Sequence, residues 1–224
     1  MSNNIILSSI DEHKYTLILL HGMYVSNKSL LKLSNKLIKR YKNLKIILPN
    51  APKRVINWPR LVENNVSSWY NYFTCNDGAM KHDKIDTTHF YQEVERINKI
   101  IDEESEILNG VSNNIIIGGI SQGGTLALHV GLMYSKKLAC IIGIHTILMN
   151  NVTKISDKCQ KIPIYLFSGN KDNIYNIKLQ NRSLNNIRKF KYKIFWHIEN
   201  NLKHCEFCKK ENKFIYDVIK KIVT

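Results

Sequence analysis

A serine between glycines lies in the middle of the chain and could act as a nucleophile. Gly119, Ser121 and Gly123 fit the pattern G-x-S-x-G, and the isoleucines at 115–117 directly before them read as a short buried strand. Residues 125–130 have the composition of a helix that packs under a sheet. A strand, this pattern and a helix in succession are typical of a nucleophile elbow, which presents the serine at a sharp turn. The flanking glycines avoid a collision across that turn.

A serine hydroxyl is a poor nucleophile until a base accepts its proton, and the base needs an acid to orient it. In folds with this elbow, the acid and then the base follow the serine along the chain. Asp172 comes just after a predicted strand, whereas the other acids after Ser121 precede a strand, follow the last strand or fall in the last helix. His204 follows a polar turn and opens the last helix, so we expect it to be the base. His197 is the alternative, although its position inside a strand favours a packing role.

The negative charge that develops on a carbonyl oxygen during acyl transfer needs two backbone N–H donors. One should be the N–H of Gln122, which follows the nucleophile and begins a helix. The second should come from the loop after His21, most simply from Met23, with His21 bracing that loop. His145 ends another predicted strand at the same edge, and it joins Trp69 as a candidate pocket residue.

Strands that alternate with helices are predicted along the chain, which indicates an α/β fold with a mostly parallel central sheet and helices on both faces. Catalytic groups in such folds collect at the carboxyl ends of the strands. We find no linker or repeat and predict a single domain, residues 1–224. The predicted strands are 5–7, 15–20, 44–48, 115–117, 139–144, 164–167 and 192–198. Helices are predicted at 26–41, at 86–108, directly after the elbow and in the last segment of the chain. The inner face of the last helix should carry Phe207, Phe214, Val218 and Ile222.

One long segment stands apart from this alternation. Residues 49–85 hold three of the four prolines and two of the three tryptophans, with few periodic signals. A connection of that length inside a compact domain is usually functional. We therefore expect an irregular segment that contributes to a substrate pocket.

The composition limits the partners of this chain. Lys and Arg exceed Asp and Glu enough to give a formal charge of +15, which attracts the phosphates of nucleic acids or of anionic lipids. The cations are spread along the chain without a nucleic-acid-binding module, so we expect no nucleic-acid partner and at most a weak association with anionic membranes. No apolar run approaches the roughly 20 residues of a spanning helix, and residues 1–4 show no secretory signal. We expect a cytoplasmic protein, peripheral if it meets a membrane.

The cysteines indicate reduced thiols and no metal. Five cysteines are scattered along the chain, which does not resemble a disulfide framework. Cys205 and Cys208 form a C-x-x-C beside His204, but a zinc site needs four ligands and no second Cys/His pair lies at a suitable spacing. We interpret these two cysteines as incidental thiols at the start of a helix.

The sequence around Ser121 resembles a known family. Gly119–Gly124 is similar to the G-F-S-Q-G-G of the acyl-protein thioesterase/lysophospholipase/carboxylesterase family of α/β-hydrolases. The chain departs from the family at Tyr24 and Val25, where Gly-Asp is usual, and at Asn201, where the family has a glycine three residues before its histidine. Four further segments resemble its oxyanion loop, its P-x-A-P and S-W-F segments and the segment that carries its acid: 19–23, 49–52, 68–70 and 168–172.

The resemblance implies an α/β-hydrolase fold and hydrolysis of a thioester or carboxylic ester through an acyl-enzyme. It implies long-chain acyl substrates, such as S-acylated proteins or lysophospholipids, and a reaction without a cofactor. Three alternatives remain open. A short-chain carboxylesterase would use the same Ser121, Asp172 and His204, a basic membrane-binding protein would have a degenerate site, and a nucleic-acid-binding protein would use the positive charge.

Overall fold

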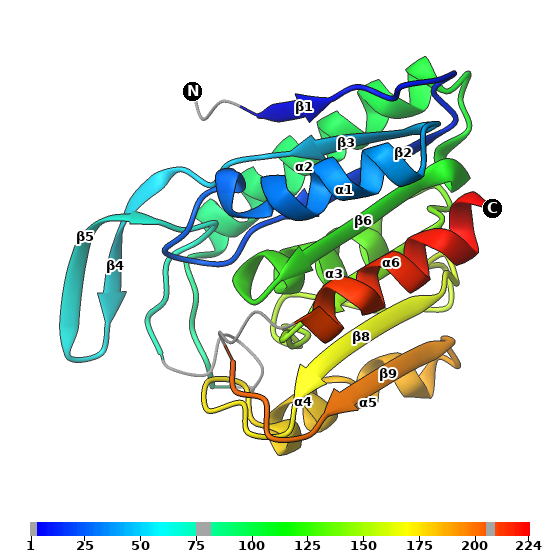
Figure 1. The fold of residues 1–224 in the computed structure, drawn as a ribbon. Helices are drawn as coiled ribbons and strands as arrows, with labels where there is room; N and C mark the ends of the chain where they lie inside the picture. The colour runs from blue at the N-terminus through cyan, green and yellow to red at the C-terminus, as the bar shows by residue number, and fades with distance from the viewer. Residues whose placement is uncertain (1–3, 75–81, 205–208) are drawn as a thin grey trace.

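A seven-stranded, mostly parallel sheet forms the centre of the protein in the computed structural model, which describes residues 4–74, 82–204 and 209–224 (Figure 1). The strand order is β1-β3-β2-β6-β7-β8-β9. Within the described chain, β1 runs antiparallel to β3 and the other neighbours in this sheet are parallel, as predicted. The strands are β1 (Ile5–Leu7), β2 (Tyr15–Leu20), β3 (Leu44–Leu48), β6 (Ile115–Ile120), β7 (Cys140–Ile144), β8 (Ile164–Gly169) and β9 (Ile194–Glu199).

Helices cover both faces of the sheet (Figure 1). α1 (Leu31–Arg40) and α6 (Lys209–Val223) lie on one face, and α2 (Thr87–Ile107), α3 (Gln122–Met133), α4 (Ile177–Ser183) and α5 (Asn185–Lys189) lie on the other. Short 3-10 turns, η1 (Asn27–Leu30) and η2 (Ser112–Asn114), precede α1 and β6. The described helices include none with the length and apolar character needed to cross a bilayer.

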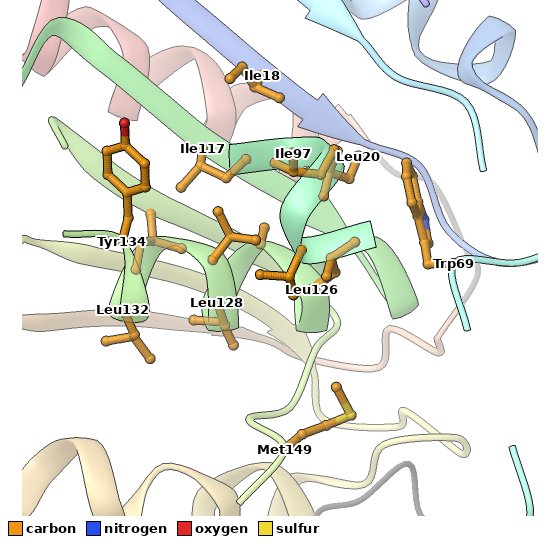
Figure 2. Close-up of a cluster of buried hydrophobic side chains, with 14 of the residues drawn as sticks. Ile18, Leu20, Trp69, Ile97, Ile117, Leu126, Leu128, Leu132, Tyr134 and Met149 are labelled. Carbon is orange, nitrogen blue, oxygen red and sulfur yellow. The ribbon is translucent and has the colours of Figure 1, made fainter. Parts of the chain in front are cut away.

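The central strands are apolar on both faces because each face is covered by helices. In β2, Leu17 and Leu19 belong to the core cluster that includes α1 and α6, whereas Ile18 and Leu20 belong to the cluster that includes α2 and α3. Figure 2 shows this second cluster, with side chains of α3 lying against those of β2, β6 and α2. The elbow strand and the elbow helix are therefore held by packing on two sides.

Residues 49–85 differ from the expected irregular connection, because they contain a β-hairpin. β4 (Lys53–Trp58) pairs antiparallel with β5 (Leu61–Ser67), and Pro59 lies in the turn between them. The hairpin projects from the body of the protein (Figure 1). Its alternation was hard to recognise because Val55, Leu61 and Val62 are exposed, so that apolar side chains do not mark one buried face.

Two other expectations need correction. α6 is described from Lys209, and His204, expected to open the last helix, lies in a turn. Phe207, expected on the inner face of this helix, lies outside the described residues. The short helices α4 and α5 were not expected, since segments of seven and five residues are too short to show a helical period.

Candidate active site

Ser121 lies at the junction of β6 and α3 in a strained backbone conformation. Its φ of 52° and ψ of −121° are rare for a residue other than glycine. Its N–H donates to the carbonyl of Ile144 at 2.8 Å, and its carbonyl accepts from the N–H of Thr125 at 3.0 Å and from the hydroxyl of Thr146 at 3.2 Å. These bonds from neighbouring elements hold the turn in place. Ser121 remains partly exposed, so its hydroxyl is within reach of a ligand.

The glycines on either side of Ser121 permit close approach of backbones. A Cβ at Gly119 would lie 2.4 Å from the backbone of Gly123, and a Cβ at Gly123 would lie 2.3 Å from the carbonyl oxygen of His21. Both distances are far below van der Waals contact, so no other residue fits without a shift of the chain. The two glycines of the G-x-S-x-G pattern are therefore required by the close packing of this turn.

Three side chains that sequence reasoning selected lie in a line of hydrogen bonds. Ser121 Oγ lies 2.8 Å from His204 Nε2, and His204 Nδ1 lies 2.8 Å from Asp172 Oδ2. A neutral imidazole that donates from Nδ1 to the carboxylate leaves Nε2 free to accept the serine proton. His204 and Asp172 are both buried, with 6% and 4% of their surface exposed. The arrangement therefore fits activation of a serine nucleophile.

Two loops are joined to bring His204 to Asp172. The N–H of Lys171 donates to the carbonyl of Leu202 at 3.0 Å, and the N–H of Asn201 donates to Asn170 Oδ1 at 2.7 Å. Gly169 allows this approach, because a Cβ there would lie 2.1 Å from the Leu202 carbonyl oxygen. Asn201 adopts a left-handed conformation, with φ of 57°, at the position where the resembled family has glycine.

The carboxylate of Asp172 is fixed at both oxygens. Oδ1 accepts from the backbone N–H groups of Ile174 at 2.9 Å and Tyr175 at 2.7 Å, while Oδ2 faces His204. Burial alone would raise the pKa of Asp172, but the interactions with His145 and His204 and the hydrogen bond from the Tyr175 N–H lower it to about 2. Asp172 is therefore ionised at neutral pH and can stabilise a charged His204.

The loop after β2 lies directly beside the nucleophile. A Cβ at Gly22 would lie 3.6 Å from Ser121 Cβ, so the segment from His21 to Met23 borders the serine. His21 is fully buried and braces the loop, since Nδ1 lies 2.7 Å from the Gly22 carbonyl oxygen and Nε2 accepts from the N–H of Ala51 at 3.0 Å. Burial lowers the pKa of His21, which keeps the ring neutral for this pair of bonds.

Tyr24 continues this loop in a left-handed conformation, with φ of 69°. Its N–H donates to the carbonyl of Ser67, and its hydroxyl donates to Glu63 Oε1 at 2.8 Å. Trp58 donates to the same carboxylate oxygen at 2.6 Å. The loop beside Ser121 is thus attached to β5, and Trp58 of β4 shares the Glu63 carboxylate with it.

The side chain of Gln122 attaches a third segment to the elbow. Its Oε1 accepts from the N–H of Trp69 at 2.9 Å, and its Nε2 donates to the carbonyl of Tyr70 at 2.9 Å and to Ser68 Oγ at 2.9 Å. The first residue of α3 therefore combines two features. Its side chain holds the segment 68–70, and its position after Ser121 at a helix N-terminus suits its N–H to a developing oxyanion.

Both candidate pocket residues are buried. Trp69 is fully buried and donates from Nε1 to the carbonyl of His21 at 2.8 Å, which supports the loop beside Ser121. His145, 1% exposed, lies behind Asp172, and a lining role for either side chain remains a prediction.

The alternative base, His197, lies on β9 and not beside Ser121. Its ring stacks on Phe167 with a centroid distance of 5.1 Å, and its Nε2 lies 3.3 Å from Glu199 Oε2. The structure therefore brings His204, and not His197, to the serine.

Sequence reasoning missed Glu211 by grouping it with the other acids of the last helix. Glu211 is buried, and its Oε1 lies 2.5 Å from His145 Nε2. A signal was present in the sequence. Glu211 lies four residues before Ile215 and seven before Val218, so this acid occupies the apolar stripe of an amphipathic helix.

Nitrogen and oxygen atoms of His145, Asp172 and His204 lie within 4.8 Å of one another, close enough to hold a metal ion. Asp172 Oδ2 and His204 Nδ1 already form a hydrogen bond, and His204 Nε2 is paired with Ser121. The cluster therefore fits proton transfer better than coordination. Cys205 and Cys208 lie outside the described residues.

The chain is similar to known proteins in both sequence and fold. The chain matches the phospholipase/carboxylesterase family over residues 1–223. Acyl-protein thioesterase 1 of Schizosaccharomyces pombe is 32% identical over 171 residues, which cover 73% of this chain and 71% of that protein. An acyl-protein thioesterase 1 homolog of Dictyostelium discoideum is 29% identical over 183 residues, with 80% and 79% covered. The crystal structure of Zea mays acyl-protein thioesterase 2 superposes with a TM-score of 0.80 over all of both chains at 17% identity, which shows a shared fold.

Proposed function

Because this chain belongs to the phospholipase/carboxylesterase family, we propose that it is a serine hydrolase that cleaves acyl thioesters or carboxylic esters through an acyl-enzyme. The observation that carries the proposal is the hydrogen-bonded line from Ser121 through His204 to Asp172. We infer a single catalytic domain, residues 1–224, around this site.

In the first half of the reaction, Ser121 Oγ attacks the acyl carbonyl carbon while His204 Nε2 accepts the hydroxyl proton. The His204 imidazolium then donates this proton to the leaving thiolate or alkoxide as the acyl–sulfur or acyl–oxygen bond breaks. Asp172, ionised at neutral pH, stabilises the imidazolium through Nδ1. In the second half, water attacks the acyl carbon while His204 Nε2 accepts a proton from the water. The acyl–Oγ bond then breaks, His204 donates this proton to Ser121 Oγ, and the carboxylic acid leaves.

The tetrahedral intermediates carry a negative charge on the former carbonyl oxygen. In this proposal, the N–H of Gln122 and the N–H of Met23 donate to that oxygen. Gln122 begins α3, whose positive dipole end faces the site, and the Gly22 backbone lies beside Ser121. Loss of one such donor typically lowers turnover about 10²–10³-fold.

We assign long-chain acyl groups on proteins or lysolipids as the substrate class. Relatives at about 30% identity that cover most of the chain are acyl-protein thioesterases, which supports S-acylated protein as the first candidate. A short-chain carboxylesterase would use the same three residues and would differ in the space available to the acyl chain. No cofactor takes part in the proposed reaction.

A chain-length series separates these two substrate classes. Purified protein is assayed with p-nitrophenyl esters and with thioesters of one thiol. In both series the acyl chain is lengthened from two to sixteen carbons. The proposal predicts that kcat/KM rises with chain length and that Ser121→Ala abolishes turnover of every substrate. A maximum at two to four carbons would identify a short-chain carboxylesterase, and turnover that persists in Ser121→Ala would contradict the proposed nucleophile.

We further infer that the protein meets its substrate at anionic membrane surfaces. The formal charge is +15, and the hairpin exposes Val55, Leu61 and Val62 close in sequence to Lys53 and Arg60, which are exposed as well. Apolar side chains beside cations are suited to the boundary between acyl chains and anionic headgroups.

A further inference from the structure

A buried histidine that the proposed mechanism does not use lies behind the catalytic carboxylate. His145 follows β7 at the same edge of the sheet as Ser121, and only 1% of its surface is exposed. Its backbone adopts a left-handed conformation, with φ of 47°, and its N–H donates to the carbonyl of Phe167 at 2.8 Å. This conformation is unfavourable for a residue other than glycine, so the surrounding structure must hold it in place.

The ring of His145 lies between two carboxylates. Nε2 lies 2.5 Å from Glu211 Oε1, and Nδ1 lies 3.5 Å from Asp172 Oδ2. The second distance is an ion-pair separation and leaves Nδ1 without a well-formed hydrogen bond. Asp172 Oδ2 also accepts from His204 Nδ1 at 2.8 Å, so one carboxylate oxygen faces two imidazoles.

This arrangement selects the charged form of His145. A neutral imidazole has a single N–H, so it could donate to one carboxylate and would direct a lone pair at the other. An imidazolium has a donor for each. Burial alone would lower the pKa of His145, but hydrogen bonds and attraction to Asp172 and Glu211 outweigh burial and raise it to about 9.

Glu211 is suited to be the counter-charge. It is buried, with 3% of its surface exposed, and a buried carboxylate is stable only when it is paired. It lies in the first turn of α6, where the helix dipole favours a negative charge. The titratable groups that face His145 from the described elements are Asp172 after β8, His204 after β9 and Glu211 on α6, while the Phe167 ring of β8 contacts it edge-on.

We propose that His145, as an imidazolium paired with Glu211, is a positioning residue that fixes and polarises the Asp172 carboxylate behind the catalytic histidine. The proposal rests on the proposed function, because it assigns Asp172 and His204 their catalytic roles. His145 Nδ1 faces the same Oδ2 that accepts from His204, while backbone N–H groups hold Oδ1.

The positive charge of His145 also affects the base. The centroids of the His145 and His204 rings lie 5.6 Å apart, a distance at which like charges oppose each other. His145 therefore favours the ionised form of Asp172 and opposes a second positive charge on the neighbouring His204 ring. Glu211 offsets most of this charge, so that the His204 imidazolium formed during turnover is still tolerated.

The charge of His145 can be measured without substrate. Protein labelled with ¹⁵N-histidine is titrated by NMR, and the ring-nitrogen shifts report the protonation of each imidazole. The proposal predicts one histidine that is still mostly protonated at pH 8 and titrates near pH 9, with a signal absent from His145→Gln. In Glu211→Gln this pKa should fall by at least one pH unit. A spectrum at pH 8 in which every histidine is neutral, or a pKa unchanged in Glu211→Gln, would overturn the ion pair.

The effect on the base is measured from the pH dependence of kcat/KM for a p-nitrophenyl ester. In His145→Gln, the apparent pKa of the acidic limb should rise, because a positive charge close to the His204 ring has been removed. A merely structural His145 would lower stability and the plateau value while leaving this pKa in place, and that result would contradict the positioning role.

His129→Gln is the matched control. His129 is also a buried histidine, and it pairs with Thr153 Oγ1 at 2.8 Å within the core around α3. Burial lowers its pKa to about 4, so it is neutral at working pH. Its replacement should lower the stability of the protein without shifting the apparent pKa of the acidic limb.

If His145→Gln fails to fold, the NMR titrations of wild type and of Glu211→Gln still show whether His145 is charged. If His145 is charged but the protein hydrolyses no ester, the ion pair stands and the proposed function fails.

Discussion

At the scale of single residues, the site depends on a carboxylate that is held ionised inside the protein. Asp172 combines burial with four hydrogen-bonding or ion-pair partners, of which two are backbone N–H groups and two are imidazoles. The sequence predicted Asp172 from its place after a strand and from the order in which acid and base follow the serine. The second imidazole could not be predicted in the same way, because the contact of His145 with Asp172 and Glu211 joins residues far apart along the chain.

The lowered pKa of Asp172 has a consequence for stability in acid. A carboxyl group whose pKa in the folded protein, about 2, lies below its ordinary value of 3.8 stabilises the fold fully above pH 4. This contribution is lost as the pH falls from about 4 through 2. Wild type should therefore lose free energy of unfolding more steeply over this range than Asp172→Asn, which has no group to titrate. Urea unfolding at intervals of half a pH unit measures both slopes, and parallel slopes would show that Asp172 is not held in its charged form.

At the scale of elements, the strand–turn–helix unit of β6 and α3 was predictable because its residues are neighbours in sequence. Its glycines are required by contacts at 2.3–2.4 Å that a Cβ would make. The hairpin β4–β5 was not predictable, because its exposed face carries apolar side chains and its alternation is lost. The sequence predicts His204 at the start of the last helix, whereas His204 lies in a turn. The contact between Gly169 and Leu202, which joins distant parts of the chain, fixes this turn.

Gly123→Ala tests the elbow. The new Cβ would meet the His21 carbonyl oxygen, and relief of that clash must move either Ser121 or the loop that carries Met23. We expect kcat/KM to fall about 10²-fold or more, because small misplacements of reacting groups have effects of that size. We expect a loss of about 1–3 kcal/mol in the free energy of unfolding.

Gly110→Ala is the control for this variant. Gly110 has a φ of 83°, and a Cβ added there would meet no described atom within 4 Å, so alanine is strained at this position but does not clash. It should lose about 1–2 kcal/mol of stability and keep wild-type kcat/KM. If both variants kept full activity, the close packing at the elbow would not be required for function.

At the scale of the whole molecule, the sequence predicted the alternation of strands and helices, and with it the mostly parallel sheet, because buried strands and amphipathic helices have distinct periods. Helices on both faces hold the carboxyl ends of β2, β6, β7, β8 and β9 in register, and the residues of the site follow these ends (Figure 1). The net charge of +15 comes from Lys and Arg residues spread along the chain, and the proposed reaction at Ser121 uses none of them. We therefore expect it to influence where the protein is found more than how it reacts.

Sedimentation with liposomes measures that influence. The protein should co-sediment with vesicles that contain phosphatidylserine at low salt, remain in the supernatant with neutral vesicles, and dissociate as the salt concentration rises and screens the charge. Leu61→Ser combined with Val62→Ser should weaken binding, and Ile107→Ser, which alters an exposed apolar residue at the end of α2, should not. Equal binding to neutral and anionic vesicles would contradict an electrostatic association.

The most direct test of the central claim is covalent labelling of the native protein with a fluorophosphonate, followed by mass spectrometry of its peptides. If Ser121 is the nucleophile and His204 its base, one label per chain will be found on Ser121, Ser121→Ala will not be labelled, and His204→Gln will be labelled far more slowly. A protein that is folded but unlabelled, or a label that persists in Ser121→Ala, would contradict the account.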